Sequence, residues 1–182
     1  MRKLLGAFIV LTPLLLVGCA TTPTTPTARR SLQADAQTTL EEMKTRDPGL
    51  QQLLDQSAGY VVFPEVGKGG VLVGGAYGRG IVYEQGQQVG FADLNQASIG
   101  AQLGGQTFSE LIVFGDQRAL NELKAGQWSI GAGVSAIALR SGAAASTTFG
   151  KQGAAVFVVP RGGAMVELSI SGQKLNFEPR AT

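Results

Sequence analysis

The chain has no histidine and only one cysteine among its 182 residues, and these two absences restrict its chemistry. Histidine is the commonest general base, and zinc prefers thiolate and imidazole ligands. The candidate carboxylates for catalysis form no close local pair; they are Glu65, Glu110, Asp116 and Glu167. We therefore expect no enzymatic activity, no metal and no cofactor.

The amino-terminal segment has the pattern of an export signal. Arg2 and Lys3 precede an apolar run over residues 4–18, which is shorter than the roughly 20 apolar residues of a spanning helix. The run ends in Leu16-Val17-Gly18-Cys19, which resembles the lipobox of bacterial lipoproteins. The resemblance implies that residues 1–18 are a lipoprotein signal peptide and that Cys19 becomes the acylated N-terminus, with a diacylglycerol and an N-acyl chain such as palmitate. The alternative is an ordinary free or buried thiol.

The expected location follows from this anchor. Two or more acyl chains hold a protein on a membrane effectively permanently. Ala20 follows the cysteine, and in Gram-negative lipoproteins a residue other than Asp there is typical of export to the outer membrane. We therefore expect a protein of the bacterial cell envelope, on the periplasmic face of the outer membrane.

The charge and composition of the mature chain limit its partners and its domain count. Loss of Arg2 and Lys3 brings the formal charge from +2 to about zero, and no basic cluster remains to indicate nucleic acid as a partner. Residues 19–30 are rich in Thr and Pro and favour an extended spacer. The spacer would reach at most about 40 Å from Cys19 to Ser31. Residues 31–182 suit a single domain.

Two periodicities divide this domain. Residues 31–58 have helical spacing of apolar positions, with Ser31 and Asp47 as candidate N-caps, and acidic exposed positions favour packing on the domain over membrane contact. Residues 59–178 alternate in the manner of strands joined by short turns, and Asp116–Lys124 is one inserted helix. The strands are expected at residues 60–63, 71–83, 89–94, 98–107, 110–114, 128–139, 154–159, 164–170 and 174–177, with turns at 84–86, 160–163 and 171–172. The prediction is an α+β fold: a curved or barrel-like antiparallel sheet with N-terminal helices and one inserted helix.

Most of the 26 glycines lie in the strand region. The segment Gly75–Gly80 loosely resembles a nucleotide-binding loop, but no helix and no Gly-Lys-Ser or Gly-Lys-Thr follows it. Glycine within strands is typical of sheet bends and close backbone approach. We therefore expect these glycines to allow tight packing of a strongly bent sheet.

The strand region also resembles a known family. Ordered motifs at residues 60–70, 74–80, 98–105, 111–114 and 131–135 are similar to those of the SYLF domain, over about residues 57–178. Eukaryotic SYLF domains bind phosphoinositide membranes and, in yeast, actin filaments. The resemblance implies the fold and an affinity for anionic lipid or another envelope surface. We expect neither an SH3 nor a FYVE companion domain beside it.

Five basic residues beside glycines are the candidate headgroup contacts, because backbone NH groups there could assist in binding an anion. They are Lys68, Arg79, Arg140, Lys151 and Arg161. The expected partners are the membrane through acylated Cys19, anionic phospholipid, and, as the alternative function, another envelope protein recognised without direct lipid binding. Ordinary solvated surface charges are the simpler interpretation of each residue.

Overall fold

The computed structural model describes residues 25–71, 73–99, 104–131, 136–163, 170 and 172–180. Its helices are α1 (Pro26–Arg46), α2 (Gly49–Asp55) and α3 (Gln117–Lys124). Its strands are β1 (Gly59–Val71), β2 (Val73–Glu84), β3 (Gln87–Ile99), β4 (Gly104–Phe114), β5 (Ala136–Ala138), β6 (Ala154–Gly163) and β7 (Gln173–Pro179). They form one sheet in the order β5-β6-β4-β1-β2-β3-β7, antiparallel except for the β5–β6 pair. The predicted α+β fold with a largely antiparallel sheet is confirmed.

Helix α1 begins earlier than the sequence suggested. Thr25 is the N-cap, and its hydroxyl accepts a hydrogen bond from the backbone NH of Ala28 at 3.2 Å. Ser31, the predicted N-cap, lies inside the helix, so this prediction is wrong by more than one turn. The predicted signal peptide and Cys19 lie outside the described residues.

Other local signals in the sequence are confirmed. The Asp116 carboxylate accepts from the backbone NH of Ala119 at 2.8 Å and caps α3, and Gly126 follows the helix with a φ of +69°. The exception is Asp47: the N-cap of α2 is Pro48, one residue after the predicted cap, although the Asp47 carboxylate accepts from the backbone NH of Gly49 at 3.1 Å. The turn between β2 and β3 at Gln85 and Gly86 has positive φ at both residues.

Three strand predictions need correction or fall outside the structure. Of the described residues in the range 128–139, Ala136–Ala138 form a strand, whereas residues 128–131 lie beside β7, where the Ile130 NH donates to the Gln173 carbonyl. The predicted turn at residues 160–163 belongs to β6, where the register shifts at Pro160. Proline is tolerated in strands at such irregular or edge positions. Residues 164–169 lie outside the described residues.

The sheet is strongly curled. Gln173 on β7 donates from its amide nitrogen to the Glu110 carboxylate on β4 at 3.1 Å, although β1, β2 and β3 lie between these strands. In a flat sheet, strands four places apart would be about 19 Å apart. The curl therefore gives the sheet an interior face, and the described strands end at β5 and β7 without closing.

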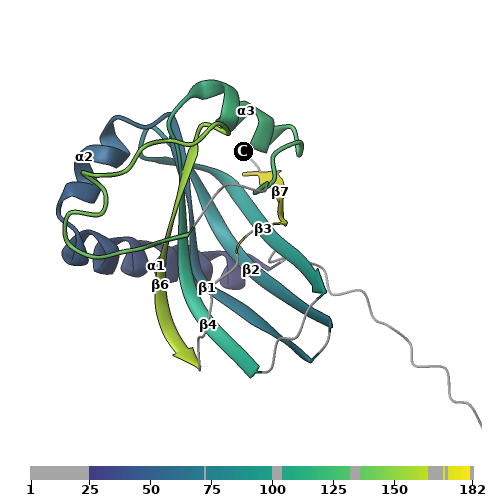
Figure 1. Ribbon diagram of the computed structural model, residues 1–182. Helices are drawn as coiled ribbons and strands as arrows, with labels where there is room; N and C mark the ends of the chain where they lie inside the picture. Colours follow the sequence, from purple (N-terminus) through teal and green to yellow (C-terminus); the bar gives the residue numbers. More distant parts are fainter. Residues whose placement is uncertain are drawn as a thin grey trace, which may run out of the picture.

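Each face of the sheet carries its own apolar core. The interior face, with Phe63, Phe108 and Ile112, is covered by α3 and the Trp128–Ile130 segment. The opposite face, called here the α1 face, packs Val62, Ile81 and other residues against α1 and α2. Figure 1 shows α1 crossing the strands on one side, α3 beside β7 at one end, and β1–β4 extending beyond α1.

Close packing accounts for several strand glycines. A Cβ on Gly80 would lie 2.7 Å from both the Val62 carbonyl oxygen and the Phe63 ring, and a Cβ on Gly78 would lie 2.8 Å from a Val66 methyl group. These glycines meet the expectation of tight packing in a bent sheet. A Cβ on Gly75 would contact only the Gln96 carbonyl oxygen, at 3.1 Å.

We predict that Gly80→Ala lowers the free energy of unfolding by about 1–3 kcal/mol, because its new methyl group overlaps backbone and a buried ring. Gly105→Ala is the matched control, since its Cβ would have the Lys68 carbonyl oxygen at 3.9 Å as its nearest neighbour. Urea denaturation measures both. Equal midpoints for the two variants would contradict the packing argument.

Candidate binding surfaces

Two of the five predicted basic residues lie on opposite faces of the sheet. Lys68 is only 7% exposed and pairs in register with Ala76, which belongs to the interior core. Arg79 is exposed on the α1 face, opposite Glu65 of β1. The alternation of strand side chains places these neighbouring cations on different surfaces.

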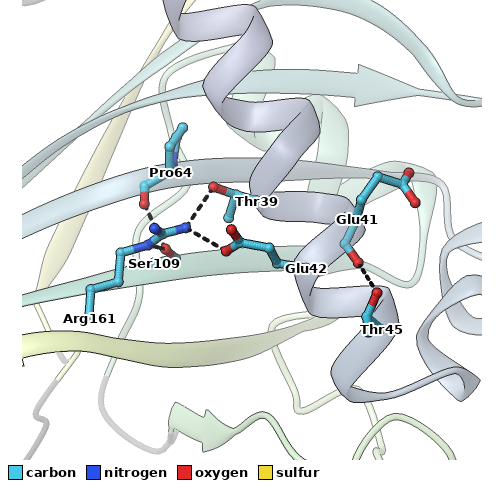
Figure 2. A network of polar contacts seen from close by, with 7 residues as sticks. All are labelled: Thr39, Glu41, Glu42, Thr45, Pro64, Ser109 and Arg161. Atoms are coloured by element: carbon cyan, nitrogen blue, oxygen red, sulfur yellow. Dashed lines mark hydrogen bonds and ion pairs between the residues drawn. The ribbon is translucent and has the colours of Figure 1, made fainter.

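Arg161 fastens α1 to the sheet (Figure 2). Its guanidinium donates to the hydroxyl of Thr39 and to the carboxylate of Glu42, both at 3.0 Å, and to the hydroxyl of Ser109. The Ser109 hydroxyl donates to the Pro64 carbonyl at 2.6 Å. The ion pair with Glu42 compensates the positive charge of Arg161, which makes this residue a structural link between helix and sheet.

Arg140 and Lys151 are exposed near the two ends of the segment that joins β5 to β6. Lys151 lies just before β6, and the first residue of β6, Ala154, pairs with Phe114 of β4. Lys68 pairs with Gln106, which is near the other end of β4. Eight residues of strand separate these points by about 27 Å. The structure therefore does not gather the five predicted residues into one patch.

A polar group lies within the interior face. Glu110 is fully buried, and burial raises the pKa of its carboxyl from 4.5 to about 8, although the Gln173 hydrogen bond and the positive charge of Lys68 oppose the rise. Gln173 is also fully buried. Among the described residues, nothing donates a hydrogen bond to Glu110 Oε1 or Gln173 Oε1. Glu110 and Gln173 therefore form a fully buried polar cluster on the interior face.

A basic surface that the sequence did not predict lies at the amino-terminal end of α1. Arg29 and Arg30 lie in the first turns of the helix. Arg29 forms a 2.7 Å ion pair with Glu178 on β7 and lies over the Phe91 ring at 4.9 Å. Arg180, two residues after Glu178, is exposed and is held by a backbone hydrogen bond to Val89. The three arginines therefore share one end of the domain.

A groove lies where α1 meets the exposed part of β1 and β2. Its volume is about 470 Å³. Its lining includes Leu32, Asp35, Glu65, Gly67, Tyr77 and Arg79. Of the five predicted contacts, Arg79 is the one that lines this groove.

The described residues provide no metal centre and no spanning helix. No three His, Cys, Asp or Glu side chains there are arranged to hold a metal ion. Within the same ranges, no helix has both the length and the apolar character needed to cross a bilayer.

Comparison with known proteins finds one family match, in the carboxyl-terminal part of the chain. Residues 95–182 match the family model described as "Ysc84: Las17-binding protein actin regulator". This match confirms, over residues 95–182, the resemblance to the SYLF domain that the sequence motifs predicted. The match begins within β3 and includes β4, α3, β6 and β7. No curated protein matches the chain.

We predict that Glu110 makes stability depend on pH. Because its folded pKa of about 8 exceeds the unfolded value of 4.5, the stabilisation is complete below pH 4.5 and is lost as pH rises through 8. Glu110→Gln removes this titration, so the variant should gain stability relative to the wild type between pH 5 and pH 8. Denaturation at both pH values measures the difference, and a constant difference would contradict the prediction.

Proposed function

We propose that the protein is a lipid-anchored envelope protein whose SYLF domain binds the anionic surface of the membrane that holds its anchor. The observation that carries the proposal is the start of α1 at Pro26, close to Cys19 and beside exposed arginines. The six residue steps from Cys19 to Thr25 reach at most about 20 Å. This is half the reach expected from the sequence, and it keeps the arginine end of the domain near the lipid headgroups.

Arginine is disfavoured at the amino-terminal end of a helix. Acidic side chains stabilise the positive end of a helix dipole, whereas basic ones there cost about 0.3–1 kcal/mol each. The first turn of α1 contains no acidic residue; Arg29 ends this turn and Arg30 begins the next one. Glu178 and Phe91 offset this cost for Arg29. An anionic membrane surface would give the exposed Arg30 a partner of opposite charge.

The expected binding strength is modest. A basic residue near an anionic leaflet contributes about 1 kcal/mol, so Arg30 and Arg180 alone give weak binding. The acyl anchor would hold the domain beside the membrane at high effective concentration, which makes weak contacts sufficient. The proposal assigns the chain no catalytic role.

Protein recognition is the second candidate function, because the description of the matching family names a protein partner, Las17. Vesicle binding separates the two candidates. An acyl-free domain that ignores vesicles of every composition would favour the protein-partner function.

We predict that the mature chain with Cys19→Ser floats weakly with anionic vesicles, less at high salt, and not with neutral phosphatidylcholine vesicles. Replacing Arg30 and Arg180 together by Gln should weaken binding by about thirtyfold. Arg140→Gln is the matched control, because Arg140 lies near the far end of α1. The Asp47 carboxylate at that end accepts hydrogen bonds from the backbone NH groups of Gly142 and Ala144, which closely follow Arg140 in the chain. A helix of 21 residues separates the two ends by about 31 Å. Equal losses in both variants would contradict the proposed surface.

We predict separately that Cys19→Ser in the full chain abolishes labelling by a fatty acid analogue and releases the protein from the membrane fraction, since the acceptor thiol is gone. Arg140→Gln in the full chain should leave labelling intact. Unchanged labelling of the Cys19→Ser chain would refute the anchor.

A further inference from the structure

The groove between α1 and strands β1 and β2 has the size of a small-molecule site. Ligand pockets commonly measure about 300–1,000 Å³, and this groove lies within that range at about 470 Å³. Leu32 and Tyr77 give it an apolar part, and Tyr77 is 40% exposed. The lining therefore combines apolar side chains with charged ones.

The groove contains both signs of charge. Glu65 and Arg79 are exposed and face each other in register on neighbouring strands. Nevertheless, neither forms an ion pair with any residue that the structure describes. Asp35 adds a second carboxylate from the α1 wall. A guanidinium and two carboxylates therefore stand around one cavity with their charges available to a ligand.

Close packing does not explain the glycine at position 67, which lies in the lining of the groove. No atom lies within 4 Å of the position that a Cβ on Gly67 would take, and the residue has no positive φ. The ring of Tyr77, its partner in register, therefore does not cover it. Glycine inside a strand costs about 0.5–1 kcal/mol relative to alanine. At Gly78 and Gly80 the fold requires glycine, whereas at Gly67 the missing side chain only leaves room in the groove.

The geometry points to a binding site for a small zwitterion that carries a primary ammonium group and an anionic group. The anion pairs with the Arg79 guanidinium, which suits phosphate or carboxylate. The ammonium group donates to the Glu65 and Asp35 carboxylates and lies near the face of the Tyr77 ring, where a cation is also favoured. This chemistry occurs in an ethanolamine phosphate headgroup and in a free amino acid.

This inference goes beyond the proposed function and does not depend on it. The ligand is recognised by its two charges, with or without a membrane. The basic end of α1 recognises only the negative charge of a surface. The two surfaces use different residues, so each can fail alone.

The test uses soluble probes on the mature protein. Calorimetry should detect binding of O-phosphoethanolamine and binding at least tenfold weaker for phosphocholine, whose quaternary nitrogen has no N–H to donate. Equal binding of the two probes, or no binding of either, would overturn the proposal. Vesicles of neutral phosphatidylethanolamine and phosphatidylcholine then identify the source. If phosphatidylethanolamine vesicles alone retain the protein, the ligand is a lipid headgroup. If the soluble probe binds but neither vesicle retains the protein, the ligand is a free zwitterion.

Variants locate the site. Glu65→Gln should remove the preference for phosphoethanolamine over phosphocholine, and Arg79→Gln should weaken both probes at least tenfold. Gly67→Val should block binding while the melting temperature stays near that of the wild type, because its side chain enters empty space. Gly105→Val is the control, with a similarly open position outside the groove lining. Wild-type affinity in Gly67→Val, or equal loss in Gly105→Val, would overturn the assignment. The Arg30 and Arg180 variant should bind the soluble probes normally.

Discussion

The curl of the sheet is the constraint on which the rest of the structure depends. It brings β7 to within hydrogen-bonding distance of β4, and it requires strands to approach so closely that Gly78 and Gly80 leave no room for a Cβ. One consequence is an interior face that buries its own core beneath α3. The other consequence is an outer face on which α1 covers only part of the strands. The exposed remainder of that face carries Glu65, Gly67 and Arg79.

Local signals in the sequence predicted much of this fold. Asp116 and Gly126 marked the ends of α3, and short turns indicated antiparallel neighbours. The start of α1 was missed because Thr25-Pro26, a sound cap and first turn, lies inside a Thr/Pro repeat that reads as spacer. The predicted helix start at Ser31 also left Arg29 and Arg30 outside the helix. The basic end of the domain was therefore invisible in the sequence.

The arrangement of the candidate site was harder to predict than the fold. Lys68 and Arg79 are both close to glycines in the sequence, but the alternation of strand side chains sends them to opposite faces. Arg161 finds Thr39 and Glu42 only because α1 crosses the end of β6, a contact between residues more than 100 positions apart. No local pattern carries such information. The interior Glu110 and Gln173 meet for the same reason, through the curl.

The features that bear on function lie along helix α1. Its amino-terminal end carries Arg29 and Arg30, its middle lines the groove, and Asp47 at its far end accepts hydrogen bonds from the 142–144 loop. The central claim is that the first end faces the membrane. The most direct measurement is quenching of an environment-sensitive label by lipid-borne quenchers in the acylated protein, with the label at Ser31 or at Ser141. The account predicts strong quenching at Ser31 and little at Ser141, and equal or reversed quenching would contradict it.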